Sequence, residues 1–594
     1  MLVIGAPPIA FVDLCRGSDV HRLTGGRCRS PTLILHNRAE RGVHGLFDFG
    51  RINLCCAHGY TLWRRGRIVY SVGNGRTVRR HPGRTGKILR ITYDYIVVGG
   101  GAAGCVMARR LAEDPDVQVL LIEAGPSDGG VASIAKGSDW ASLMGGPYDW
   151  GYAYEPSPHV NDRTIPIPRG KVLGGSSSTN AMLWYRGHPS DYDAWDCFGA
   201  TGWGFDALLP YFRRSEDWEG GATSFRGAGG PMRVERPRDP HPVATTMLEA
   251  ARELGFSTID DANAATNEGA TLANFNMRGD ERWSAARGYL APAADWPNLT
   301  ILVDSQAVGL GFEGTQCTTV RHRVGGAIIE TRADREIVLT LGAIDTPRLL
   351  ILSGIGAPDD LRALGLRVTA ALPGVGQNFQ DHPLLMGVNF RARAPLAPVR
   401  GNGGGAMLNW RSRHGLSGPD LHAFIVQSAG GRRDIADKAS DVFAIAPGLM
   451  RSKSRGFLRL VEARPNGRLT IQPNLLANPD DLAALVDGLD TVMDLAETAA
   501  YREMIAAPVF DRRMSKATKI AFVRDNCSTF YHCCGSCAMG EGDAAVVDSQ
   551  LRVRGVDGLR IADASIIPVI PSCNTQAPVI MIAERTAALM RQAT

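Results

Sequence analysis

The stretch Tyr95-Ile96-Val97-Val98-Gly99-Gly100-Gly101-Ala102-Ala103-Gly104 decides the fold of this chain. Its first four residues are apolar and mostly β-branched, which predicts a buried strand that ends at a cluster of glycines. Residues 105–112 then predict a helix, and residues 117–122 predict a second strand that ends in Glu123. The order strand, G-x-G-x-x-G, helix, strand and acid is typical of a unit that binds a dinucleotide.

Each glycine of the motif has a separate physical reason. Gly99 permits the tight turn, Gly101 lets the backbone approach a diphosphate, and Gly104 lets the helix pack on the strand. The free N–H groups at the start of the helix favour the diphosphate charge. Glu123 follows 19 residues after Gly104, where a carboxylate can accept hydrogen bonds from ribose hydroxyls. The motif by itself fits FAD and NAD equally.

The composition places the whole chain among globular proteins. It has 594 residues, 44% apolar and 21% charged, and a mean hydropathy of −0.09. These values indicate roughly two to four globular domains and argue against a disordered or fibrous chain. No uninterrupted apolar run of ~18 residues occurs, so we expect no transmembrane segment. The 12 cysteines are too few for a disulfide scaffold, and we expect reduced thiols and a cytoplasmic location.

The first 90 residues differ from the rest in charge. They hold 16 of the 65 Lys and Arg residues but only 4 of the 60 Asp and Glu residues. The remainder is mildly acidic, so the net charge of +5 predicts no nucleic-acid partner. The segment also lacks the basic start and following apolar run of a secretory signal. We therefore expect a poorly ordered Arg-rich extension over 1–90, a transit peptide, or a stretch that precedes the true start.

Further motifs follow the dinucleotide unit in a fixed order. They are Ala124-Gly125, RGKVLGGSSSTNAM at 169–182, GAIDTPRLLILSGIG at 342–356, GVGQNFQDHP at 374–383, YHCCGSCAMG at 531–540 and IADASIIP at 561–568. Together they resemble the glucose–methanol–choline (GMC) family of FAD-dependent oxidoreductases. The resemblance covers about 93–594 and is weaker between roughly 390 and 520.

The resemblance implies an α/β fold with two domains. One is a Rossmann-like FAD-binding domain, a mixed sheet with flanking helices, assembled from 91–235 with 296–385 and 525–594. The other is an α+β substrate-binding domain with an antiparallel sheet, formed by 236–295 with 386–524. Residues 480–501 predict a helix in that second domain, because apolar residues recur there every three or four positions.

The glycine turn and the family motifs together indicate the residues that bind FAD. These are Gly99, Gly101, Ala103, Gly104, Glu123, Ala124, Gly174, Gly175, Ser176, Asn180, Ala181, Ala307, Asp563, Ala564, Asn574 and Ala577. Asp563 could instead only cap a helix. Some family members attach FAD covalently through a histidine just before the loop asparagine. Thr179 stands there in this chain, so we expect non-covalent FAD.

Oxidation of an alcohol by a flavin needs a base for the hydroxyl proton, and histidine suits that task because its pKa lies near working pH. His532 occupies the position of the family's catalytic histidine in the pattern H-x-x-G-[TS]-C-x-M-G. The family's second catalytic residue, His or Asn, falls here on Gln576. Glutamine keeps an amide that can donate to the substrate oxygen or accept from its hydroxyl, but it is longer by one methylene. We interpret His382 as structural.

The predicted reaction is oxidation of a primary alcohol to the aldehyde, with O₂ or another electron acceptor reoxidising the flavin. Two alternatives remain: a hydroxynitrile lyase of the same fold, and a catalytically silent flavoprotein, which the unusual Gln576 favours. Trp184 and Tyr185, just after the flavin loop, suggest an aromatic pocket wall. The cluster Cys533, Cys534 and Cys537 has poor spacing for zinc, so we predict no metal.

Overall fold

The computed structural model describes residues 61–64, 67–70, 92–430 and 440–592. The chain divides into two compact units, 1–79 and 80–594. In the first unit, β1 (Thr61–Arg64) pairs antiparallel with β2 (Arg67–Tyr70). The rest of the extension expected over 1–90 lies outside the described residues.

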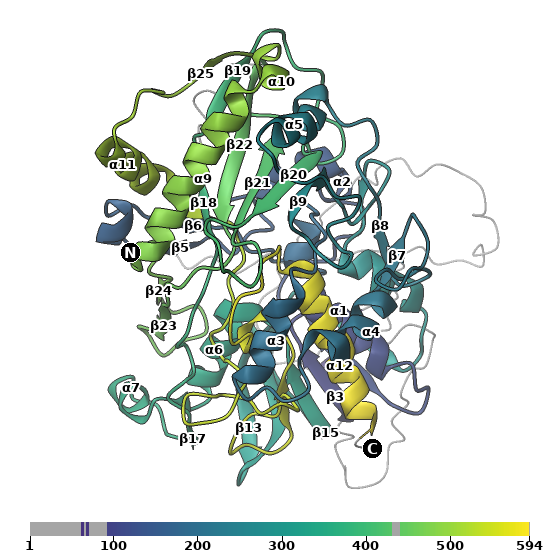
Figure 1. Ribbon diagram of the computed structural model, residues 1–594. Helices are drawn as coiled ribbons and strands as arrows, with labels where there is room; N and C mark the ends of the chain where they lie inside the picture. Colours follow the sequence, from purple (N-terminus) through teal and green to yellow (C-terminus); the bar gives the residue numbers. More distant parts are fainter. Residues whose placement is uncertain (1–60, 65–66, 71–91, 431–439, 593–594) are drawn as a thin grey trace, which may run out of the picture. The chain divides into compact units, whose positions relative to one another are not determined.

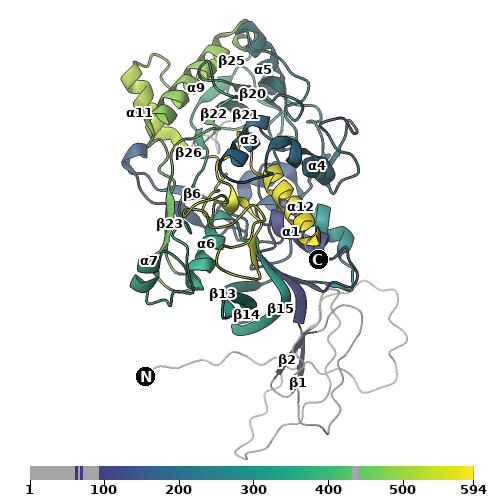
Figure 2. The same ribbon diagram turned by 60° about the horizontal axis from the view of Figure 1, so that its bottom comes forward.

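A mixed sheet of seven strands contains the dinucleotide unit. Its parallel part has the order β12 (Leu299–Leu302), β4 (Val119–Ile122), β3 (Thr92–Val98) and β15 (Ala327–Leu339), and β27 (Leu559–Ile561) also pairs parallel with the end of β15. The first half of β15 continues into an antiparallel ribbon with β14 (Gln316–Val324) and β13 (Ser305–Glu313), which Figure 2 shows side by side.

Helices pack on this sheet and on one another. α1 (Ala102–Leu111) follows β3 directly, and α12 (Gln576–Gln592) runs beside it near the C-terminus (Figure 1). α6 (Gly342–Leu352) packs against β13. The sequence pattern explains the core, because all four residues from Tyr95 to Val98 are buried.

The second sheet is antiparallel and has eight strands. Its members are β25 (Ile505–Pro508), β19 (Asn389–Ala392), β22 (Val442–Leu449), β21 (Leu421–Val426), β20 (Ala406–Trp410), β9 (Gly269–Leu272), β18 (Pro383–Leu385) and β26 (Cys527–Thr529). The helices α9 (Pro479–Glu497) and α5 (Pro242–Glu253) pack on this sheet, and Figure 1 shows α9 crossing it. Every residue of β22 is buried.

The other described elements are short. The helices are α2 (Ala132–Ala135), α3 (Pro189–Cys197), α4 (Phe205–Ser215), α7 (Pro358–Ala363), α10 (Ala499–Arg502) and α11 (Lys516–Asn526). The paired strands are β5 (Tyr152–Tyr154) with β6 (Ile165–Ile167), β7 (Glu216–Trp218) with β8 (Met232–Val234), β10 (Met277–Arg278) with β11 (Glu281–Arg282), β16 (Ile355–Gly356) with β17 (Ala370–Ala371), and β23 (Phe457–Leu460) with β24 (Leu469–Gln472).

The predicted α/β fold with a mixed and an antiparallel sheet is confirmed. The predicted domain boundaries stay a prediction, and β18 and β26, which lie inside segments assigned to the FAD-binding domain, hydrogen-bond in the antiparallel sheet. The helix expected over 480–501 is confirmed as far as Glu497, but Thr498, with φ −59° and ψ 156°, leaves the helical conformation and divides the segment into α9 and α10. Within the described ranges, no helix is long and apolar enough to cross a membrane.

Candidate active site

One large cavity brings the two sheets' functional segments together. Its volume is about 1180 Å³, more than the ~300–1,000 Å³ of an ordinary small-molecule pocket. The glycine turn after β3, the loop 175–183 and the start of α6 line one part. Residues of β18, β21 and the segment 528–533 line another part. A cavity of this size has room for a dinucleotide and a substrate together.

The glycines of the turn are needed for different reasons. Gly99 has φ +106°, and a Cβ there would stand 2.7 Å from Thr340 O. A Cβ on Gly104 would stand 1.8 Å from Gly99 O, so α1 packs on the turn only with glycine there. A Cβ on Gly101 would meet nothing nearer than Thr340 O at 3.8 Å. The protein therefore does not need a glycine at 101 for its own packing, and the space it leaves belongs to the cavity.

The start of α1 offers the groups that a diphosphate needs. Gly101 is its N-cap and has no side chain to cap the helix, and Gly101, Ala102 and Ala103 all line the cavity. First-turn N–H groups of a helix have no intrahelical acceptor and carry partial positive charge. Gly175, with φ +54°, packs so closely that a Cβ would stand 2.8 Å from Gly101 Cα. These residues fit the diphosphate of FAD.

Glu123 lies at the end of β4 and borders the cavity. Its Oε2 accepts from Gly100 N and its Oε1 accepts from Gly125 N, each at 2.7 Å. Burial raises the pKa of Glu123 to about 7. Each carboxylate oxygen has a second lone pair, so Glu123 can hold the turn and still accept from a ribose hydroxyl.

Most of the sequence-predicted cofactor residues line this cavity. They are Gly99, Gly101, Ala103, Glu123, Ala124, Gly175, Ser176, Asn180, Ala181, Ala307, Asp563, Ala564 and Asn574. Three do not. Gly104 packs on the turn, Gly174 N donates to Gly100 O at 2.7 Å, and Ala577 is fully buried in α12. Asp563 caps the short helix at 564–566 and also accepts from Gly342 N at 2.8 Å.

His532 lies three residues after β26, and 7% of its surface is exposed. Its Nε2 is 3.2 Å from Asn574 Nδ2, and its Nδ1 is 2.9 Å from His382 Nδ1. Burial lowers the pKa of His532 well below its usual value. The ring is therefore held neutral, as a base must be.

The contact between the two rings limits where their protons can lie. A lone pair on His532 Nε2 requires the proton on His532 Nδ1, which then donates to His382 Nδ1. His382 in turn carries its own proton on Nε2. In this arrangement the amide of Asn574 donates to His532 Nε2. The interpretation of His382 as structural missed this contact, because nothing in the sequence pairs residues 150 positions apart.

Asp381 holds the backbone of both histidines in place. Its Oδ1 accepts from His382 N and from His532 N, each at 2.8 Å. Its Oδ2 accepts from Tyr154 Oη at 2.5 Å and from Thr529 Oγ1. The carboxylate thus ties the segment before β18 to the segment after β26, and this places the imidazole of His532 at the cavity wall.

Gln576 is the first residue of α12 and lines the cavity. Its Oε1 accepts a hydrogen bond from Asn180 Nδ2, so the loop that begins at Gly175 is tied to α12. The chain therefore brings both predicted catalytic residues, His532 and Gln576, to the same cavity.

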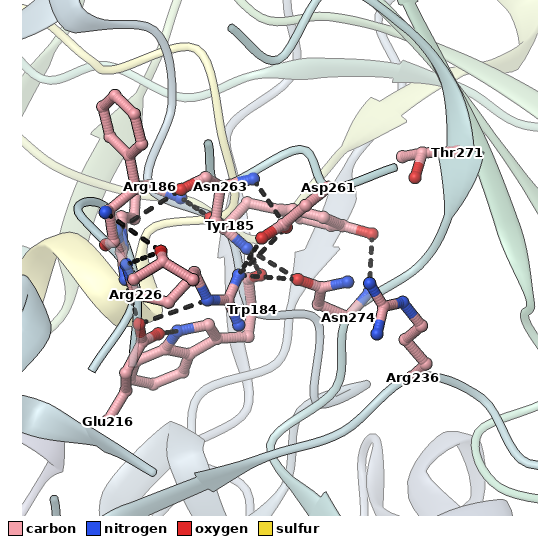
Figure 3. Close-up of polar contacts among 12 residues, drawn as sticks. Trp184, Tyr185, Arg186, Glu216, Arg226, Arg236, Asp261, Asn263, Thr271 and Asn274 are labelled. Atoms are coloured by element: carbon pink, nitrogen blue, oxygen red, sulfur yellow. Dashed lines mark hydrogen bonds and ion pairs between the residues drawn. The ribbon is translucent and has the colours of Figure 1, made fainter. Parts of the chain in front are cut away.

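The aromatic wall expected at Trp184 and Tyr185 is wrong. Both side chains are buried away from the cavity, and Figure 3 shows them within a polar network. Trp184 Nε1 donates to Glu216 Oε2 at 3.1 Å, and Asn263 Nδ2 donates to Trp184 O at 3.0 Å. The network turns these rings inward because it satisfies their polar groups there.

Other aromatic residues line the cavity instead. Phe424 of β21 and Phe530 stack with their ring centroids 5.2 Å apart, and Phe530 lies 4.7 Å from the ring of His532. Leu384 and Met386 complete this apolar wall. The signal was available in the sequence only for Phe530, which lies two residues before His532.

Cys533, Cys534 and Cys537 are buried and free of disulfides. Burial raises the pKa of the Cys533 thiol to about 12. Among the residues that the structure describes, no group of three or more His, Cys, Asp or Glu side chains could hold a metal ion.

Comparison with known proteins decides the family. Models of the N- and C-terminal parts of GMC oxidoreductases match residues 93–384 and 452–583. The chain belongs to the GMC oxidoreductase family. It is 37% identical to human mitochondrial choline dehydrogenase over 545 residues, 84% of this chain and 90% of the relative. It is 36% identical to the oxygen-dependent choline dehydrogenase of Chromohalobacter salexigens over 543 residues, 84% of this chain and 95% of that one.

Solved structures give the same assignment. Pyridoxine 4-oxidase from Mesorbium loti matches with a TM-score of 0.82 and 32% identity, over 84% of this chain and 99% of that structure. A formate oxidase matches with a TM-score of 0.80 and 26% identity, over 85% and 99%. This GMC oxidoreductase is an FAD-dependent enzyme that acts on CH–OH donors.

Proposed function

We propose that this GMC oxidoreductase oxidises a primary alcohol to the aldehyde, with His532 as the base. The observation that carries the proposal is a buried imidazole, His532, at the wall of a cavity large enough for FAD and a substrate, where burial lowers its pKa and so favours the neutral form. The alcohol loses its hydroxyl proton to His532 Nε2. FAD held in this cavity would supply the acceptor for the hydride of the carbinol carbon, which balances the two-electron oxidation.

The surroundings of His532 suit the proton that it receives. When Nε2 is protonated, the ring becomes a cation whose Nδ1–H already donates to His382. A hydrogen bond to a charged donor is stronger than one to a neutral donor, so this contact stabilises the cation. Asp381 holds the backbone of both histidines, so the ring stays in place during the reaction. The amide of Asn574, which donates to the same lone pair in the resting site, gives up that bond to the substrate hydroxyl.

We further propose that FAD is bound without a covalent link. Thr179 stands before Asn180, where a histidine would provide an imidazole nitrogen for attachment, and it lines the cavity. A threonine hydroxyl has no comparable nucleophilic nitrogen. Acid precipitation of the purified protein should release all of its flavin into the supernatant, and flavin that stays in the precipitate would contradict this part of the proposal.

The cavity wall favours an uncharged, apolar substrate. Four of the described residues that line the cavity are carboxylates, and each already accepts bonds from other protein groups: Glu123, Asp149, Asp345 and Asp563. None of the four belongs to the apolar wall of Leu384, Met386, Phe424 and Phe530. Choline is the second candidate, because choline dehydrogenases are among the relatives and aromatic faces also attract quaternary ammonium groups.

Two alcohols of the same shape separate these candidates. Choline and 3,3-dimethylbutan-1-ol differ only in a charged nitrogen in place of a carbon. We expect anaerobic mixing with 3,3-dimethylbutan-1-ol or benzyl alcohol to bleach the long-wavelength flavin absorbance at least as fast as choline does. Bleaching by choline alone would reverse the order of the two substrates. Fast recovery in O₂ would identify an oxidase, and slow recovery a dehydrogenase.

Two further outcomes would favour the alternative functions of this fold. Release of cyanide from a cyanohydrin without flavin bleaching would replace the proposal with a hydroxynitrile lyase. Bound yellow flavin that no alcohol bleaches, with no lyase activity, would indicate a silent flavoprotein.

A further inference from the structure

A buried guanidinium lies behind the loop that lines the cavity. Arg282, at the end of β11, is only 2% exposed, and it does not itself line the cavity. Its Nε donates to Ile134 O at 2.9 Å, and its Nη1 donates to Asn180 O at 2.5 Å. No carboxylate of the described residues forms an ion pair with it. Burying a cation without an anionic partner costs free energy of folding, so we expect Arg282 to have a function that compensates for this cost.

Its bonds fix the orientation of one side-chain amide. Arg282 Nη1 donates to Asn180 Oδ1 at 3.0 Å, and Met182 N donates to the same atom at 2.9 Å. Guanidinium and backbone N–H groups can only donate. The atom that faces them must therefore be the amide oxygen of Asn180. Its Nδ2 is consequently the end that faces Gln576, where it can only donate.

The second amide is fixed by the first. Because Asn180 Nδ2 donates, the atom of Gln576 that it contacts must be Oε1. The other end, Nε2, is buried and has no hydrogen-bond partner among the described residues. Gln576 lines the cavity. An unpartnered buried donor at a cavity wall is a site for an acceptor atom of a ligand.

We propose that Arg282 is a positioning residue that acts through Asn180 to turn the Nε2 end of Gln576 toward the substrate oxygen. The inference rests on the proposed function for the identity of that oxygen. Gln576 then donates to the oxygen of the alcohol and, as His532 removes the hydroxyl proton, to the developing alkoxide. The reverse orientation would present Oε1, which would repel that negative charge. A donor aimed at the developing charge is the arrangement that accelerates such a step.

Replacing Asn180 by aspartate should reverse the amide. Asn180→Asp keeps the shape and gives Arg282 a carboxylate, but both side-chain oxygens now only accept. Gln576 must then turn its Nε2 to residue 180 and its Oε1 to the cavity. Arg282→Met removes the guanidinium donor to Asn180 and leaves Met182 N as the remaining donor to its Oδ1, so both amides are held less firmly.

Two probes report the orientation without turnover. 3,3-Dimethylbutanal offers only an acceptor, and protonated 3,3-dimethylbutylamine offers only donors; their dissociation constants are measured on the holoenzyme from the change in flavin absorbance. The wild-type ratio of the two constants is the reference, because the amine can also donate to the Nε2 lone pair of His532. In Asn180→Asp the ratio of the two constants should shift toward the amine by about tenfold or more, the change expected when one buried hydrogen bond is lost and another gained. In Arg282→Met the ratio should shift in the same direction by a smaller factor, because Met182 N still donates to Asn180.

A matched control separates this effect from general damage. Arg455 also donates to backbone carbonyls, at 2.8 Å to Ser452 O and 2.9 Å to Ser454 O, and does not line the cavity. Arg455→Met should leave the probe ratio at the wild-type value. If Asn180→Asp and Arg282→Met also leave it unchanged, the proposal is wrong. Failure of every alcohol to bleach the flavin would instead contradict the proposed function.

Discussion

Replacing His422 with glutamine should change how the stability of the protein depends on pH. His422 lies on β21, is buried, and does not line the cavity. Its Nδ1 is 2.7 Å from Asn409 Oδ1, and burial lowers its pKa to about 3. In the unfolded chain a histidine takes up its proton near pH ~6.5.

The sign and size follow from this difference. Above pH ~6.5 the ring is neutral in both states and the pH has no effect through it. As the pH falls below that value, the unfolded chain binds one proton more than the folded chain, so stability is lost. The loss is about 1.4 kcal/mol per pH unit. Between pH ~6.5 and ~4.5 His422 therefore costs about 2–3 kcal/mol.

The assay is urea unfolding of the holoenzyme with excess FAD at a series of pH values from neutral to mildly acidic. Loss of packing in His422→Gln lowers the unfolding free energy equally at every pH. Loss of the titrating ring makes the fall with acid shallower by about 1.4 kcal/mol per pH unit. If the unfolding free energies of the variant and the wild type fall in parallel with pH, His422 is not held neutral by burial.

Three other predictions follow from the site. Gly101→Ala should change the apoprotein's unfolding free energy by no more than about 0.5 kcal/mol, but it should weaken FAD binding at least about tenfold in a flavin titration. Gly104→Ala should instead destabilise the apoprotein, because its Cβ would stand 1.8 Å from Gly99 O. Equal effects of the two substitutions would contradict the assignment of the turn. Because burial lowers the pKa of His532, a base there stays neutral on acidification, and the acid limb of kcat/KM should lie below pH ~6.5; a limb at or above that value would exclude a buried neutral base. Asp381→Ala leaves four donors without an acceptor and should lower the free energy of unfolding by about 3 kcal/mol or more. Asp381→Asn should lower it much less, because its amide can donate to the hydroxyls of Tyr154 and Thr529. Equal losses in thermal or urea unfolding would show that the charge of Asp381, and not its hydrogen bonds, stabilises the fold.

The parts of the fold that could be predicted depend on local constraints. The turn after β3 is such a case, because Gly99 has φ +106° and a Cβ at Gly104 would collide with Gly99 O within the same strand–turn–helix unit. The helix break at Thr498 was also within reach. Threonine is a good N-cap, and Thr498 Oγ1 accepts from Tyr501 N at the start of α10.

The rest depends on contacts between distant segments. His382 meets His532 across 150 residues, and Asn180 meets Gln576 across 396. A single sequence carries no signal for such pairs. The direction of the Trp184 side chain was predicted wrongly for a related reason. Trp184 lies outside the regular strands, so no alternation of residues predicts where its side chain points.

The most direct test of the account is the rate at which a primary alcohol bleaches the bound flavin in the absence of O₂, in the wild type and in His532→Ala. Both proteins must first carry the same amount of FAD, measured by absorbance. Loss of the base should slow the bleaching by about 100- to 10,000-fold, with partial recovery at high pH, where the alcohol ionises more readily. A variant that holds its FAD and is bleached at the wild-type rate would contradict the assignment of His532 as the base.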